Sequence, residues 1–202
     1  MKTTILLLLC FLMLSCNNNQ EPSEKSCCKS KTKEDLHKKI SGESIYNLAT
    51  IWTTQDNDSL QMKEFSGYIV ISAMVFTHCE SACPRIVADM KRIESKLTDK
   101  EMESVKFLLV SMDPERDTPA RLREFATEHK LNDRWTLICS SQDATQEIAN
   151  VLGVRIKKLE DGGFDHSNII HVFDQGGIII RQQNGFDAEQ IEILQAIKSL
   201  TH

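Results

Sequence analysis

Hydrophobic residues recur along most of the chain in two patterns, one typical of buried strands and one typical of amphipathic helices. An almost unbroken apolar run at residues 67–76 indicates a strand that is covered on both faces. After Pro84 the apolar residues are spaced by four, three and four positions, with charged residues between them, which indicates an amphipathic helix. This apolar stripe consists of Ile86, Met90, Ile93 and Leu97.

Further elements are predicted from composition and from residues that begin or end helices. Two segments flank an Asp-Gln-Gly-Gly turn and predict a β-hairpin. The predicted strands are 44–53, 105–111, 135–139 and the hairpin strands 169–173 and 178–181. One predicted helix spans 118–130 and begins at Thr118-Pro119, and a second spans 141–153, with a Ser141 cap and an end at Gly153. A last helix has a capping-box-like start at Asp187 and Gln190. Its apolar residues are Ile191, Leu194, Ile197 and Leu200.

Strands that alternate with helices predict a mostly parallel sheet with helices on both faces, to which the late hairpin adds antiparallel strands. This order fits the thioredoxin-like fold, an α/β architecture with a central mixed, mostly parallel sheet flanked by helices and with an inserted β-hairpin. Reactive groups in open sheets of this kind gather at the C-terminal ends of strands. Residues 77–79 lie at such an end.

The first 15 residues have the pattern of a bacterial signal peptide, with a basic residue, an apolar stretch at 5–14 and a small Ser15. A helix that spans a bilayer needs about 20 apolar residues, so this stretch predicts a cleaved signal and not a permanent anchor. Residues 12–16 resemble a lipobox, in which the cysteine, here Cys16, becomes lipid-modified. A Met three residues before the Cys departs from the common pattern, and cleavage without lipid is the alternative.

Residues 16–43 are polar, have no sustained apolar period and predict a flexible tether before a folded domain at 44–202. Adjacent Cys27 and Cys28 lie in this tether, where they are poorly placed for a disulfide with each other. They are either an accessory metal or redox site or exposed thiols with no fixed role.

Composition and charge exclude several classes of protein. The chain has 24 Lys and Arg against 29 Asp and Glu, a formal charge of −5 that offers no basic surplus for a phosphate backbone, so no nucleic-acid partner is expected. A hydrophobic fraction of 41% with 26% charged residues is typical of a globular domain and excludes disorder and fibre. Seven cysteines are too few and too scattered for a miniprotein built on disulfides.

The main candidate for chemistry is a C-x3-C-P sequence at 79–84, between the 67–76 strand and the amphipathic helix. In a helical turn, residues at this spacing have Cα atoms about 6 Å apart, close enough for a disulfide or for both sulfurs to bind one metal. A helix N-terminus favours the thiolate, which is both the nucleophile and the metal ligand. Cys79 and Cys83 are therefore a candidate metal or redox pair, with a structural disulfide as the alternative. Cys139 ends the 135–139 strand and is predicted to lie in the core.

A metal held by two thiolates needs at least one more donor, and six histidines are available. His166 is the first candidate, because it lies in a polar segment just before the 169–173 strand with Asp165 beside it to orient the ring. His78 ranks second. It adjoins Cys79 in the sequence, and the side chains of neighbouring residues at a strand end usually point in different directions. Four histidines have no supporting motif: His37, His129, His171 and His202.

Two thiolates and one imidazole form a soft, low-coordinate set, which suits copper, especially Cu(I), better than magnesium, calcium or manganese. Structural zinc would want four ligands, but a three-ligand zinc site with an open position is known chemistry. The ligand types alone therefore leave the metal open.

Three ordered motifs resemble those of the Sco/SenC family. The first is the C-x3-C-P sequence after an apolar strand, and the second is Val-Ser-Met-Asp-Pro-Glu-Arg-Asp-Thr-Pro at 110–119, which resembles the family's signature almost residue for residue. The third is Asp-His-Ser at 165–167 before an apolar strand. The resemblance spans 44–202, and three motifs in order are far more specific than any one of them.

The resemblance implies a thioredoxin-like domain that binds one copper ion, Cu(I) or Cu(II), through Cys79, Cys83 and His166. It also implies a domain that faces the extracytoplasmic space and is held to a membrane. Together with the signal-peptide and lipobox-like patterns, this predicts a position on the periplasmic side of a bacterial membrane, with a lipid anchor on Cys16. Such proteins resemble chaperones that deliver copper to the binuclear copper centre of cytochrome c oxidase, or maintain its thiols. A copper-accepting protein such as an oxidase subunit is thus the expected partner. Asp113 is interpreted as a turn and helix-cap residue.

Two departures from the family concern the surroundings of the site. The chain has Glu-Ser-Ala between the cysteines, where the family often has a Pro or an Asp, and 157–163 replaces an aromatic-rich stretch. Two functions stay open, a metallochaperone that binds copper stoichiometrically and a thiol-disulfide oxidoreductase in which one thiolate attacks a partner disulfide and the other resolves it. The second would leave His166 dispensable. A peroxidase is disfavoured because Cys79 lacks the T-x-x-C environment of thiol peroxidases.

Overall fold

The computed structural model describes residues 41–185 and 191–201 of the 202-residue chain. The predicted signal peptide, most of the tether and the capping box of the last helix lie outside the described residues. So do Cys16, Cys27, Cys28, His37 and His202. Within the described ranges, no helix is both long enough and apolar enough to cross a membrane.

A seven-stranded mixed sheet forms the centre of the fold. Its strands, in chain order, are β1 (Trp52–Thr54), β2 (Ser59–Leu60), β3 (Ile69–Val75), β4 (Val105–Ser111), β5 (Trp135–Cys139), β8 (Ile169–Phe173) and β9 (Ile179–Asn184). Across the sheet they lie in the order β2-β1-β5-β4-β3-β8-β9. Strands β3, β4 and β5 are parallel, whereas the other pairs are antiparallel. The predicted α/β class with a mixed sheet is confirmed, but parallel pairing is confined to these three central strands.

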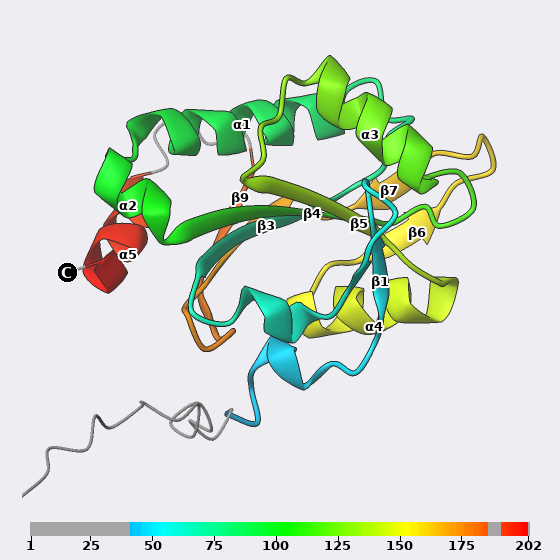
Figure 1. Cartoon of the computed structure of the whole chain (residues 1–202). Helices are drawn as coiled ribbons and strands as arrows, with labels where there is room; N and C mark the ends of the chain where they lie inside the picture. Colours follow the sequence, from blue (N-terminus) through cyan, green and yellow to red (C-terminus); the bar gives the residue numbers. More distant parts are fainter. Residues whose placement is uncertain (1–40, 186–190, 202) are drawn as a thin grey trace, which may run out of the picture. The chain divides into compact units, whose positions relative to one another are not determined.

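Helices cover both faces of this sheet. Helices α1 (Ala82–Lys96) and α3 (Pro119–Glu128) lie on one face and α4 (Gln142–Leu152) lies on the other (Figure 1). Helices α2 (Asp99–Glu103) and α5 (Ile191–Thr201) contact each other near one end of the sheet. Two short 3-10 helices, η1 (Ile45–Asn47) and η2 (Met62–Phe65), precede β3.

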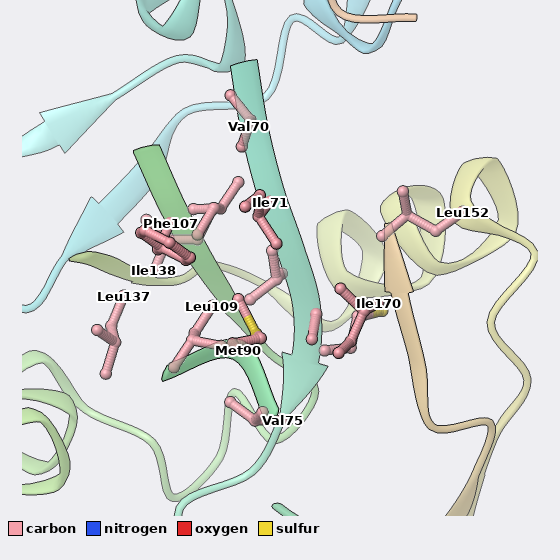
Figure 2. Packing of buried hydrophobic residues seen from close by; sticks show 14 of the residues in the cluster. Val70, Ile71, Val75, Met90, Phe107, Leu109, Leu137, Ile138, Leu152 and Ile170 are labelled. Atoms are coloured by element: carbon pink, nitrogen blue, oxygen red, sulfur yellow. The ribbon is translucent and has the colours of Figure 1, made fainter. Parts of the chain in front are cut away.

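The core lies around β3 and β4. All residues of β3 are buried, as expected for a strand with helices on both faces. Figure 2 shows Val70, Ile71 and Val75 along β3 with Phe107 and Leu109 of β4 beside them. Burial of each large aliphatic side chain contributes about 1.5–3 kcal/mol relative to its exposure. The predicted stripe of α1 packs on this core through Ile86, Met90 and Ile93.

The predicted starts of α3 and α4 and the predicted end of α4 are confirmed, whereas α3 ends at Glu128, before the predicted Lys130. The Thr118 hydroxyl accepts a hydrogen bond from the Arg121 N–H at the start of α3, and the Ser141 hydroxyl accepts one from the Ala144 N–H at the start of α4. Gly153 ends α4 in the left-handed conformation, φ 66°. The last helix differs in detail, because Ile193 and Ile197 are buried while Ile191 is 51% exposed.

The prediction of one strand over 44–53 is wrong. Residues 45–47 form η1, and only Trp52 and Thr53 of the predicted segment belong to β1. Side-chain hydrogen bonds override the strand-like composition, because the Ser44 hydroxyl accepts from the Tyr46 N–H and donates to the Gly176 carbonyl. The Tyr46 hydroxyl in turn donates to the Phe65 carbonyl. These contacts form a turn and tie it to two loops.

A small two-stranded sheet, β6 (Ile156–Lys158) paired with β7 (Phe164–His166), was not predicted. The sequence predicts a polar loop around His166, whereas this residue is the last of β7 and pairs with Ile156. Both strands are short and partly exposed, so they lack the alternation of apolar and polar residues that reveals a strand from sequence.

The register of the main sheet brings three chain segments to one edge. Val75, the last residue of β3, lies beside Ser111, the last residue of parallel β4. Strand β8 is antiparallel to β3 and places Ile170, near its start, beside Ala73. The loops that leave β3 and β4 therefore lie close to the segment that enters β8, which follows His166 directly.

We expect Gly177→Ala to lower the free energy of unfolding by at least about 1 kcal/mol. Gly177 has φ 77°, and a Cβ there would lie 2.7 Å from the Ser44 Oγ and 2.8 Å from the Tyr46 ring. Urea unfolding measures the effect, with Gly176→Ala as the control. In that control the new Cβ meets only the Asp174 side chain, at 3.3 Å or more. Equal midpoints for the two variants would contradict this account.

Candidate metal centre

The two cysteines lie where β3 passes into α1. Cys79 is half-buried in the loop, and Cys83 is buried in the first turn of α1. The backbone N–H of Cys83 donates to the Cys79 Sγ at 3.4 Å, and the backbone N–H of Phe76 donates to the Cys83 Sγ at 3.4 Å. Both cysteines are free thiols in this structure, as is Cys139, which is buried in the core as predicted.

The two thiols have opposite acidities. A hydrogen bond from the Cys83 thiol, helped by backbone N–H groups of Cys83, Ser81 and Ala82, lowers the pKa of Cys79 to about 5. The same thiol pairing and its burial raise the pKa of Cys83 well above the ordinary value. Cys79 is therefore the accessible thiolate at neutral pH, and Cys83 is a buried thiol beneath it.

His166 and Cys79 line the same hollow on the protein surface. This hollow is open and has a volume of about 460 Å³, and its walls include Phe76 and Phe164. The rings of His166 and Phe76 are nearly perpendicular, at 81°, with centroids 6.0 Å apart, and the backbone N–H of Phe76 donates to the Cys83 Sγ. The fold thus brings the first-ranked histidine into the same hollow as Cys79. The ligand atoms of Cys79, Cys83 and His166 do not all lie within 4.8 Å of one another in this structure.

The partner of the His166 ring differs from the prediction. Its Nδ1 lies 3.3 Å from the carbonyl oxygen of Ser167, so a backbone group and not the Asp165 side chain is its hydrogen-bond partner. Among the described residues, no group forms a hydrogen bond with the Nε2 atom, which is the nitrogen that suits a metal.

His78, the second-ranked histidine, also lines the hollow but faces another set of residues. Its Nδ1 lies 3.2 Å from the Thr77 hydroxyl and 3.7 Å from the Asp117 carboxylate. Two of the histidines without a motif lie elsewhere. His171 is buried in β8 with Nε2 2.9 Å from the Leu152 carbonyl oxygen, and His129 ends α3 against Phe125.

Asp117 joins the loops after β3 and β4, a role that sequence reasoning missed. Its carboxylate accepts hydrogen bonds from the Thr77 and Ser111 hydroxyls, both at 2.6 Å, and from the Thr77 N–H. Burial raises the pKa of this carboxyl, although the three donors counteract the effect. The network fixes the start of the loop that carries Cys79. The motif at 110–119 was the available signal, but it did not show which Asp has this role.

Arg116 fastens the β6–β7 hairpin to the loop after β4. Its guanidinium forms an ion pair with the buried Asp113 and donates a hydrogen bond to the Gly162 carbonyl, in the turn between β6 and β7. The interpretation of Asp113 as a turn residue is correct, because its carbonyl accepts from the N–H groups of Arg116 and Asp117. Its interpretation as a helix-cap residue is wrong, because Thr118 caps α3. Through Arg116, the hairpin whose second strand ends in His166 is tied to the loop after β4.

The fold and the thiol pair at the start of α1 define a thioredoxin-like protein with a histidine beside its cysteines. Comparison with known proteins then gives the family. The SCO1/SenC family profile matches residues 48–202, so the chain belongs to the SCO1/SenC family, and the resemblance found in the sequence is confirmed.

Three known proteins illustrate the similarity. The SCO1 protein homolog of Bacillus subtilis is 27% identical over 150 residues, which cover 72% of this chain and 77% of that protein. A structure of BsSco, described as a member of the Sco family of cytochrome c oxidase assembly proteins with a disulfide switch, has a TM-score of 0.67 at 25% identity and covers 75% of this chain and 91% of that one. The structure of Arabidopsis thaliana ScoI with copper bound has a TM-score of 0.63 at 22% identity and covers 73% and 93% of the two chains.

Alkylation of Cys79 by iodoacetamide should depend on pH with a midpoint near 5, because the thiolate is the reactive form. The rate should be constant above that pH and fall below it. Cys83→Ala removes the thiol donor and should move the midpoint up, towards the ordinary value of 9.0. Mass spectrometry of the peptide that contains Cys79 separates it from the other cysteines. A midpoint near 9 in the unchanged chain would contradict the acidity derived from the structure.

Proposed function

We propose that this protein binds one copper ion, Cu(I) or Cu(II), through Cys79, Cys83 and His166 and passes it to a copper-accepting protein such as a subunit of cytochrome c oxidase. The observation that carries the proposal is the shared hollow, which Cys79 and His166 both line above the buried Cys83. Membership of the SCO1/SenC family and the copper in the Arabidopsis relative support it.

The donor set fits copper as cargo. Two thiolates and one imidazole are soft or borderline donors, and they hold Cu(I) well with few ligands. Cys79 is already a thiolate at neutral pH, whereas Cys83 must lose its proton when it binds the metal. The hollow is open to solvent, so a thiolate of a partner can approach the ion and replace these ligands one at a time.

Location is a further part of the proposal. The signal-peptide pattern at 1–15 and the lipobox-like sequence that ends in Cys16 support export and a lipid anchor on the periplasmic side of a bacterial membrane. A lipid anchor followed by a polar tether would leave the domain free to meet a membrane-bound oxidase.

Thiol-disulfide exchange is the second candidate, and the unequal acidity of the two thiols favours it. The Cys79 thiolate would attack a partner disulfide and release one partner thiolate, and Cys83, after losing its proton, would attack the Cys79 sulfur and release the other. The partner is then reduced, and this chain ends with a Cys79–Cys83 disulfide. A dithiol reductant must restore it before the next cycle.

Replacement of each candidate ligand separates the two functions. We expect the reduced chain of residues 44–202 to bind one Cu(I), Cys79→Ala and Cys83→Ala to lose stoichiometric binding, and His166→Ala to bind at least about tenfold more weakly. Competition with a chromophoric Cu(I) chelator measures the affinities. His78→Ala is the matched control, since it changes the other histidine of the hollow and should leave the affinity unchanged.

The same variants test disulfide exchange with a small disulfide substrate. His166→Ala should keep the exchange rate of the unchanged chain, because the imidazole takes no part in the sulfur chemistry. Failure of the reduced, folded chain to bind copper would overturn the copper proposal and leave thiol-disulfide exchange. Equal loss of copper binding and exchange in His166→Ala would contradict the separation of roles.

A further inference from the structure

A second group of metal-ligating side chains lies beside the thiol pair and has no part in the copper proposal. Asp113 and Asp117, from the loop after β4, are buried with side-chain exposures of 1% and 0%. His78, from the loop after β3, lies next to them with 44% of its side chain exposed. One ligand atom of each residue lies within 4.8 Å of one ligand atom of each of the others.

The hydrogen bonds of the two carboxylates leave one oxygen unused. Asp117 accepts three donors, two hydroxyls and a backbone N–H. Asp113 binds Arg116 through Oδ2 only. Its Oδ1 is buried and has no hydrogen-bond partner within the described part of the chain. A buried carboxylate oxygen without a donor is costly, so the unused oxygen indicates a missing positive partner.

The local balance of charge also indicates a missing positive partner. Two buried carboxylates lie together, and Arg116 pairs with one of them. The nearby Arg121 donates to the Thr77 hydroxyl and carbonyl and is ion-paired with Glu124 and Glu128. The His78 Nδ1 is 3.7 Å from Asp117, which is too long for a hydrogen bond. Among the described residues, no contacting side chain therefore neutralises the second carboxylate by a direct hydrogen bond.

We infer that His78, Asp113 and Asp117 form a binding site for a divalent cation that prefers oxygen and imidazole ligands, such as Mn²⁺. One nitrogen and two carboxylate oxygens are hard or borderline donors, unlike the thiolates of the neighbouring site, and they disfavour Cu(I). The exposed His78 ring can rotate to complete the set, while the two carboxylates are already fixed by their neighbours. The bound ion would link the loop that carries Cys79 to the loop after β4.

Mn²⁺ is a suitable probe because thiolates are poor ligands for it, so the full reduced chain can be used with all its cysteines. Electron paramagnetic resonance of the free ion gives the bound fraction. We expect one Mn²⁺ per chain, with affinity reduced at least about tenfold in His78→Gln and in Asp113→Asn. His78→Gln changes an exposed side chain and is the variant least prone to misfold. Glu80→Gln, an exposed carboxylate in the same loop but outside the cluster, is the control and should bind as the unchanged chain does.

Three results would overturn the inference: no saturable Mn²⁺ binding up to millimolar concentration, binding that His78→Gln and Asp113→Asn both retain, and binding that Glu80→Gln abolishes equally. The copper proposal is tested separately in the same proteins. The variant with both Cys79→Ala and Cys83→Ala should lose Cu(I) and keep Mn²⁺, and His78→Gln should keep Cu(I) and lose Mn²⁺. Failure of one site is thus distinguishable from failure of the other.

Discussion

The geometry of the thiol site depends on the buried carboxylate of Asp117. Through Thr77 and Ser111 it connects the ends of two parallel strands, and so fixes the point from which the Cys79 loop departs. Arg121 adds two hydrogen bonds to Thr77, and α1 begins at Ala82. A carboxylate buried in this way costs free energy unless donors satisfy it, and here the donors are the N–H and hydroxyl of Thr77 in the loop and the hydroxyl of Ser111 at the end of β4. The Asp117 carboxylate is therefore satisfied only when the Cys79 loop has folded against it.

The difference in burial and acidity between the two cysteines follows from the position at which Asp117 holds the loop. Cys79 stays at the surface, where N–H groups at the start of α1 and the Cys83 thiol stabilise its anion. Cys83 lies one helical turn further, in the core, where the Phe76 N–H is its backbone partner. A half-buried thiolate beside a buried thiol is suited to sulfur exchange, and the same pair with an imidazole in the shared hollow is suited to a soft metal. The two proposed functions therefore use one arrangement of sulfur atoms, and the histidine is what distinguishes them.

Much of this arrangement could be predicted from the sequence, because local rules determine it. The unbroken apolar run of β3, the stripe of α1, and the Thr118 and Ser141 caps all depend on residues close together in the chain. The place of the cysteines at a strand-to-helix junction followed from the same rules. His166 was selected from six histidines by its position before an apolar strand, and antiparallel pairing of β8 with β3 brings it to the hollow that Cys79 also lines.

What could not be predicted depends on contacts between distant residues. The turn at 45–47 is formed by Ser44 and Tyr46 with loops far along the chain, which no local propensity reports. The β6–β7 hairpin is short and polar and is fastened by Arg116, from a loop that the sequence marks only as a family motif. Which aspartate of that motif joins the loops became clear only from the hydrogen bonds of Asp117.

The central claim is that Cys79, Cys83 and His166 hold copper together. X-ray absorption spectroscopy at the copper edge of the reduced, Cu(I)-loaded chain of residues 44–202 tests it most directly. The account predicts two sulfur ligands and one imidazole nitrogen, with the nitrogen lost in His166→Ala while both sulfurs remain. A spectrum with sulfur ligands alone in the unchanged chain, or one unaltered by His166→Ala, would contradict the claim.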